Sequence, residues 1–194
     1  MRLKILFIIL LLIMLGCISS PDKNYYQLHL EGGKIAGKIK IDKTILVRDI
    51  DIDPAYNDYR IIYRNSPYQV NFYSYEFWVK KPNDLVKDSI IDYFKSNGIF
   101  RKISGKVEGR EPDLIMRSKI RIIEEYDIGN KWYARLSMDL SIENYKKNKM
   151  SIVHSFDRKI KLERKRTSDI PVILSLILRE ELDKVLIKIS AVKN

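Results

Sequence analysis

The sequence predicts an α+β fold, a single two-layer domain in which a mainly antiparallel sheet is covered by two amphipathic helices. The first observation is the alternation of apolar and polar residues over 114–122, 132–143 and 150–157. Such alternation is typical of strands with one packed and one solvated face. The second is the spacing of apolar residues by three and four over 82–97 and 168–189, which indicates helices that bury one side.

Shorter strands are expected before the first helix. In the strand expected over 68–78, the alternating apolar positions shift by one residue at Phe72-Tyr73. Because side chains alternate between the two faces of a strand, this shift predicts a bulge or a break. Asn65-Ser66-Pro67 is a suitable hairpin turn between the last two. These strands span residues 25–30, 45–53, 59–64 and 68–78.

Signals at the helix ends agree with these boundaries. Pro82-Asn83-Asp84 is a typical helix start and Asn97-Gly98 a typical end, while Thr167 or Ser168 is expected to cap the final helix. The sequence shows no internal repeat and no second linker. We therefore expect one domain.

Composition excludes several classes of protein. The chain has 194 residues, a net charge of +11, one cysteine and two histidines. A single cysteine is too few for a disulfide framework, a multi-cysteine zinc site or an iron–sulfur cluster. The positive charge makes an anionic neighbour plausible, and neither a cofactor nor a metal is expected.

The first residues are typical of an export signal. Arg2 and Lys4 precede an uninterrupted apolar run from Ile5 to Leu15. Crossing a bilayer core as a helix takes about 20 residues, so this run is too short for a durable span. A charged start followed by a short apolar stretch predicts a secretory signal peptide.

The end of this segment resembles the lipobox of bacterial lipoproteins. Met14-Leu15-Gly16-Cys17 matches it well at Gly16 and Cys17 and more loosely at the first two positions. That resemblance implies cleavage between Gly16 and Cys17 and lipid attachment to the Cys17 sulfur. The alternative is an ordinary signal peptide followed by an incidental free cysteine.

These boundaries divide the chain into a signal peptide (1–16), a lipidated tether (17–23) and one domain (24–194). The expected location is the bacterial cell envelope, held by the lipid anchor. Ile18, rather than aspartate, follows the cysteine, which favours the outer membrane, with the domain facing the periplasm.

Catalytic and metal-binding patterns are sparse. His29 and His154 both lie in strand patterns, where a core or rim histidine is the simpler interpretation, and no Gly-x-Ser-x-Gly elbow supports a hydrolase. Asp49, Asp51 and Asp53 alternate as ligands of a divalent ion could. A solvated strand edge running into a proline explains them equally simply. No catalytic and no metal-binding residue is assigned.

A cluster of basic residues is the better candidate for an interaction surface. Nucleic acid is not expected as the partner of an exported protein, so anionic headgroups or an acidic protein are the natural counterparts. The alternative is a solvated strand end and linker. The cluster consists of Arg158, Lys159, Lys161, Arg164, Lys165 and Arg166.

Aromatic residues crowd the segment 56–78. One face of a sheet cannot bury all nine of them, so some are expected to contact a partner, another copy of the chain or lipid. They are Tyr56, Tyr59, Tyr63, Tyr68, Phe72, Tyr73, Tyr75, Phe77 and Trp78.

The order of these segments resembles the ABC-type transport auxiliary lipoprotein family, whose members are similar to paraquat-inducible protein C. The resemblance covers nearly the whole chain after the leader, although the lipobox is loose and the strong positive charge is not a family requirement. The matching segments are Cys17, Tyr25–Leu28, Ile45–Asp53, Ile61–Arg64, Phe77-Trp78, Pro82–Phe94, Gly98–Phe100, Pro112–Ile115 and the last helix.

The resemblance implies a non-enzymatic accessory subunit with a fold like the amino-terminal domain of TolB. It would work beside an ABC permease and ATPase and a protein with a mammalian-cell-entry (MCE) domain, in a system that moves lipid or another hydrophobic substrate. An envelope assembly or structural lipoprotein that scaffolds another complex is the alternative. A homo-oligomer stays open.

Overall fold

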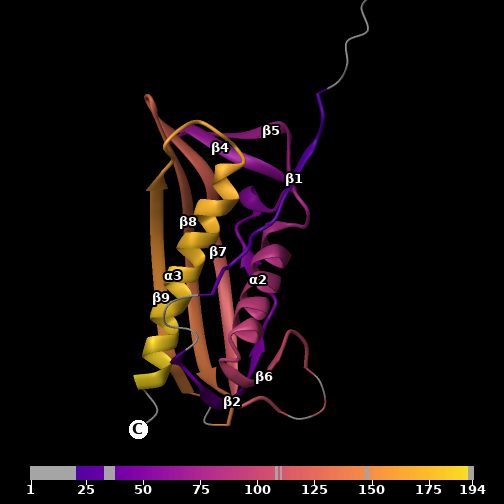
Figure 1. Cartoon of the computed structure of the whole chain (residues 1–194), viewed down its shortest axis with the longest axis vertical. Coiled ribbons are helices and arrows are strands. Elements are labelled where there is room, and N and C mark those ends of the chain that lie inside the picture. Colours follow the sequence, from indigo (N-terminus) through magenta and orange to yellow (C-terminus); the bar gives the residue numbers. More distant parts are fainter. Residues whose placement is uncertain (1–20, 33–37, 108, 110, 147–148, 192–194) are drawn as a thin grey trace, which may run out of the picture.

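The computed structural model describes residues 21–32, 38–107, 109, 111–146 and 149–191. The predicted leader and Cys17 lie outside the described residues. The elements follow in the order β1 (Asn24–Tyr26), β2 (Ile41–Val47), β3 (Asp51–Ile52), the 3-10 helix η2 (Pro54–Tyr56), β4 (Arg60–Ser66), β5 (Gln69–Trp78), α2 (Pro82–Ser96), β6 (Phe100–Ser104), β7 (Leu114–Ile128), β8 (Lys131–Asn144), β9 (Lys149–Lys161) and α3 (Asp169–Ala191) (Figure 1).

The three long strands form the antiparallel part of the sheet, as their alternation predicts. β7 pairs with β8 and β8 with β9, with Met138 of β8 opposite Ile120 and Phe156. Every second residue of β8 from Ala134 to Ile142 is buried. These strands lie along the long axis of the molecule (Figure 1).

The other edge of β7 is shared by three short strands. β2, β3 and β4 pair with it in parallel, one after another along its length. β6 extends the sheet beyond β2, while β5 and then β1 extend it beyond β4. The longest ladders are antiparallel as expected, but among the described strands five short pairings are parallel, so the sheet is mixed.

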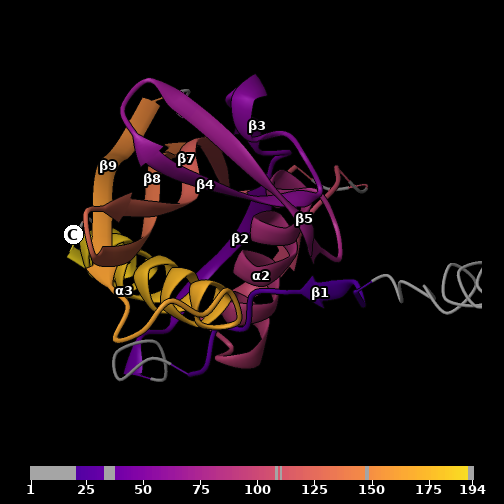
Figure 2. The same ribbon diagram turned by 90° about the horizontal axis from the view of Figure 1, so that it is seen from above.

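Both helices lie on the inner side of the curled sheet (Figure 2). Leu178 and Leu182 of α3 are fully buried in the core, and α2 buries Phe94 against Phe100 of β6, with ring centroids 5.2 Å apart. On each helix, the apolar residues that recur every three or four positions form the side that is buried in the core. The α+β two-layer prediction is confirmed.

Several strand boundaries differ from the expected ones. The first strand stops at Tyr26, and the expected strand 45–53 is divided into β2 and β3. The slip at Phe72-Tyr73 is confirmed as an irregularity. Phe72 and Phe77 of β5 lie opposite residues only two apart in β4, so β5 carries extra residues there. No helix within the described ranges is long and apolar enough to cross a bilayer.

Candidate functional site

The structure divides the predicted basic cluster. Arg158 points toward α3 and pairs with Glu180 at 2.7 Å and Glu181 at 3.0 Å. Lys159, the next residue in the strand, lies on the opposite face over the rings of Tyr126 and Tyr133. Neighbouring strand residues point to opposite faces, so the cluster is not one surface.

The loop that follows β9 carries the rest of the cluster. Lys165 binds Asp127 at 2.8 Å, and Arg166 lies 4.0 Å from Asp169. Lys161 and Arg164 are exposed, and within the described part of the chain no ion pair or hydrogen bond engages them. Of the six predicted contact residues, these two are therefore the most available to an external anion.

Lys165 covers a buried acidic cluster that the sequence analysis did not find. Glu125, with a side chain 1% exposed, accepts a hydrogen bond from Tyr73 at 2.8 Å. Burial raises the pKa of Glu125 to about 7. The hydrogen bond from Tyr73 opposes this rise, and the nearby carboxyl group of Asp127 adds to it. One oxygen each of Glu125 and Asp127 is buried without a hydrogen-bond partner among the described residues, and both burial and the charge of Asp127 favour the protonated form of Glu125.

A second buried carboxylate lies on the opposite face of β7. Glu124 accepts hydrogen bonds from Tyr56 at 2.6 Å and Arg64 at 3.1 Å, and Arg135 lies 3.5 Å away. Burial and, to a smaller extent, the hydrogen bond to Glu124 raise the pKa of Tyr56 to about 12. The hydroxyl therefore stays protonated and remains a donor. This network ties η2 and β4 to β7, and its role is structural.

His154 belongs to an ionic network at the edge of the core. Its Nε2 lies 2.7 Å from Glu181 and its Nδ1 3.0 Å from Lys188 of α3. Burial acts to raise the pKa of Glu181, but hydrogen bonds from Lys184, His154 and Arg158 outweigh it and lower that pKa. The interpretation of His154 as a rim histidine is confirmed by these contacts.

The other histidine lines a shallow pocket beside α3. The backbone N–H of His29 donates to Ser175 Oγ at 3.1 Å, and that hydroxyl donates to the carbonyl of Pro171 at 2.6 Å. The Ser175 hydroxyl is thus committed to the backbone. No contact between a histidine ring and a serine hydroxyl occurs among the described residues, so the geometry offers no support for a hydrolase.

The alternating aspartates serve local structure. Asp53 caps η2 through the backbone N–H of Ala55 at 2.9 Å, and Asp49 pairs with Lys87 at 2.6 Å. Across the described ranges, no group of three or more acidic, histidine or cysteine side chains is arranged to bind a metal ion. The strand-edge interpretation accounts for them.

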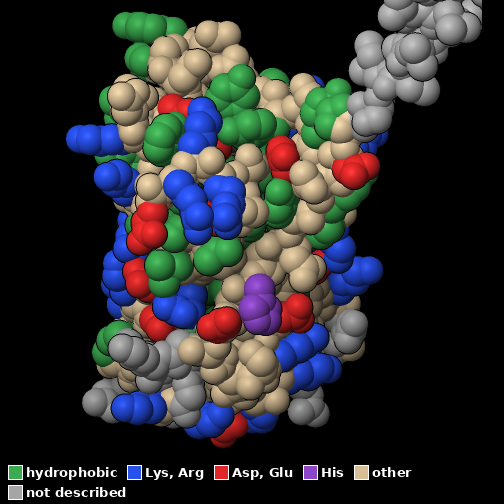
Figure 3. Space-filling model, turned by 45° about the horizontal axis from the view of Figure 1, so that its top comes forward, with side chains coloured by type: hydrophobic (Ala, Val, Ile, Leu, Met, Phe, Trp, Pro, Cys, Tyr) green, Lys and Arg blue, Asp and Glu red, His purple; other side chains and the backbone are tan. Residues whose placement is uncertain are grey.

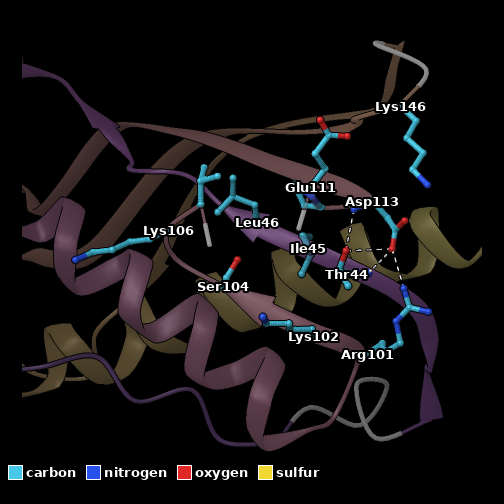
Figure 4. A pocket seen from close by; sticks show the side chains of 12 residues that line it. Thr44, Ile45, Leu46, Arg101, Lys102, Ser104, Lys106, Glu111, Asp113 and Lys146 are labelled. Atoms are coloured by element: carbon cyan, nitrogen blue, oxygen red, sulfur yellow. Dashed lines mark hydrogen bonds and ion pairs between the residues drawn. The ribbon is translucent and has the colours of Figure 1, made fainter. Parts of the chain in front are cut away.

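A groove of about 830 Å³ lies where β2 passes between β6 and β7 (Figure 4). Asp113 accepts hydrogen bonds from the backbone and hydroxyl of Thr44, and its own N–H donates to that hydroxyl at 2.8 Å. Arg101 adds a contact at 3.1 Å. The remaining charged lining residues are exposed and of both signs: Lys102, Lys106, Glu111 and Lys146. The groove does not select a ligand of one charge.

The aromatic segment is only partly buried, as expected. Tyr56 and Trp78 belong to the core, whereas Tyr68 is 96% exposed. The remaining exposed aromatics of the segment lie on or beside the β4–β5 hairpin and are Tyr59, Phe72 and Tyr75.

The fold is shared with solved structures, although no family model and no curated protein matches the sequence. A Xanthomonas campestris protein described by the family model DUF330 is similar with a TM-score of 0.74 at 14% identity, over 87% of this chain and 98% of that one. An uncharacterised protein is similar with a TM-score of 0.70 at 12% identity, over 87% of this chain and 99% of that one. A hypothetical protein from Chlamydia trachomatis is similar with a TM-score of 0.53 at 6% identity, over 75% of this chain and 96% of that one. The described domain therefore corresponds to nearly the whole of these chains.

Proposed function

We propose that this chain is a membrane-anchored accessory lipoprotein of an ABC/MCE-type transport system that moves lipid or another hydrophobic substrate across the cell envelope. It acts by docking and not by catalysis. The anchor fixes the domain at a membrane, and this confinement raises its local concentration near a partner without any new contact. Its proposed partners are the MCE-domain protein and the ABC permease and ATPase of the same system.

The single observation that carries the proposal is the position of the only cysteine. Cys17 follows an apolar run and a glycine, and it precedes the first strand, at Asn24, by a short tether. Lipidation of Cys17 explains both the leader and the cysteine.

Replacing Cys17 tests the anchor. Mass spectrometry of the wild-type protein should show a chain cleaved before Cys17 and carrying acyl groups, with the protein in the membrane fraction. Cys17→Ser should remain uncleaved and unacylated, because serine offers no sulfur for the lipid, while Ser20→Ala should behave as wild type. An unmodified wild-type chain, or a leader still attached, contradicts the proposal.

Cross-linking in membranes followed by purification tests the partners. Recovery of an MCE-domain protein with its permease and ATPase supports the transport role. Recovery of a different envelope machine, with no defect in lipid transport on deletion, favours the scaffold alternative instead.

A further inference from the structure

One end of the long axis brings together segments that are distant in the sequence. The pairing of Arg64 with Tyr126 places the tip of the β4–β5 hairpin beside the end of β7. The pairing of Tyr133 with Lys161 brings the end of β9 to the same place. The hairpin crosses this end, and β1 pairs with the end of β5 that is farthest from the hairpin tip (Figures 1 and 2). We call this region the tether end.

Exposed aromatic side chains lie along the whole β4–β5 hairpin, with Tyr68 at its tip and with Tyr25 and Tyr59 beside Phe77 and Trp78 at the other end of β5. Tyr68 at the hairpin tip is 96% exposed, Tyr25 on β1 is 60% exposed and Tyr59 is 51% exposed. Phe72 is 37% exposed and stacks on Arg60 at 4.3 Å. Amphipathic rings of this kind favour the boundary between lipid and water, because the ring enters the apolar layer while the hydroxyl stays hydrated.

Cations accompany these rings. Lys131, Lys161 and Arg164 are exposed, and no described side chain pairs with them, while Glu163 is the exposed acid beside them. Figure 3 shows hydrophobic, basic and acidic side chains interleaved on the face that this end presents. Cations close to an anionic membrane surface are attracted to its headgroups.

The length of the tether decides which end faces the membrane. A fully extended chain covers at most about 3.5 Å per residue, so Asn24 lies within roughly 25 Å of a lipid-bearing Cys17. The helix α3 runs along the long axis and has 23 residues, which at about 1.5 Å each is roughly 35 Å. The opposite end therefore cannot replace the tether end as the part nearest the bilayer.

We propose that the tether end is a membrane-contact surface, with the exposed aromatic rings at the level of the lipid headgroups and with Lys161 and Arg164 binding anionic headgroups. The inference rests on the proposed acylation of Cys17. It adds an orientation that anchoring alone does not require, because a flexible tether also permits a domain that stays clear of the surface.

Two tryptophan reporters test the contact. The full acylated chain carrying either Tyr68→Trp or Val107→Trp is reconstituted into vesicles of phosphatidylcholine and phosphatidylglycerol brominated near the headgroup. Val107 is 69% exposed and lines the groove at the far end, so it is a matched control. We expect a blue shift and loss of emission for the Tyr68→Trp reporter and neither for the Val107→Trp reporter, after subtraction of the wild-type signal from Trp78 and Trp132.

Flotation of the vesicles and mass spectrometry separate this proposal from the anchor. Acylated protein that floats while the Tyr68→Trp reporter is unquenched, or is quenched no more than the Val107→Trp reporter, overturns the contact surface and leaves the anchor standing. Protein without acyl groups that fails to float overturns both. The double change Lys161→Glu and Arg164→Glu should reduce quenching of the Tyr68→Trp reporter in vesicles with phosphatidylglycerol. Unchanged quenching there overturns the assignment of anionic headgroups.

Discussion

Replacing Glu125 by glutamine should remove the pH dependence of the free energy of unfolding that the buried acidic cluster creates. Glu125 accepts a hydrogen bond from Tyr73 with one oxygen, and its other oxygen is buried without a hydrogen-bond partner among the described residues. A glutamine carbonyl can accept from Tyr73, and its amide can donate to the Asp127 oxygen that has no other partner. The variant therefore keeps the contacts of the protonated acid and removes its charge.

The magnitude follows from the pKa of Glu125, which burial raises from 4.5 to about 7. Between these pH values the folded protein holds a proton that the unfolded chain has released, so the free energy of unfolding falls as the pH rises. Each pKa unit corresponds to about 1.4 kcal/mol, which sets an upper limit of about 3 kcal/mol for the loss between pH 4.5 and pH 8. The opposing charge of Lys165 is already included in that pKa, and about 2–3 kcal/mol of the loss falls between pH 5 and pH 8.

Urea unfolding followed by circular dichroism at several pH values between 5 and 8 measures this difference. The glutamine variant should match the wild type near pH 5 and exceed it by about 2 kcal/mol at pH 8. Glu163→Gln, which removes an exposed carboxylate near Lys165, is the control and should follow the wild type. Parallel curves for the Glu125 variant and the wild type would refute the raised pKa of Glu125.

Two further substitutions test the other buried carboxylates. Hydrogen bonds from Lys184, His154 and Arg158 outweigh burial and lower the pKa of Glu181. Glu181→Gln should therefore reduce the free energy of unfolding by about 2 kcal/mol at pH 7, and this loss should disappear as the pH falls through the lowered pKa. Tyr56→Phe removes the hydrogen bond to Glu124 and should cost about 1–2 kcal/mol in urea unfolding, whereas Tyr68→Phe should have no measurable effect. Equal effects at the two tyrosines would contradict the assigned network.

The long strands and both helices could be predicted because each buries one face. The alternation along β8 follows directly from the packing of Ala134, Leu136 and Met138 against the helices. Which strands pair was not predictable, because the period of two is the same whether a neighbouring strand is parallel or antiparallel. The parallel strands beside β7 were missed for that reason.

The acidic clusters could not be predicted because the end of β7 departs from the simple pattern. A register shift between Ile120 and Ile122 changes which residues face the core, and it buries Glu124 and Glu125 on opposite faces. Their hydroxyl partners lie 68 and 52 residues away in the sequence. A short-range pattern carries no information on such distant partners.

The same contacts change what the basic cluster means for function. A net charge of +11 suggested an anionic neighbour, yet Arg158 and Lys165 neutralise buried acids of the same domain. Within the predicted basic cluster, the charge available for binding is that of Lys161 and Arg164 at the tether end, which would supply about 1 kcal/mol each near an anionic surface. In the proposed lipoprotein, acyl chains would contribute about 0.8 kcal/mol for each buried methylene group and would dominate the attachment. Added salt should therefore weaken the orientation of the domain on the membrane while leaving its anchoring unchanged.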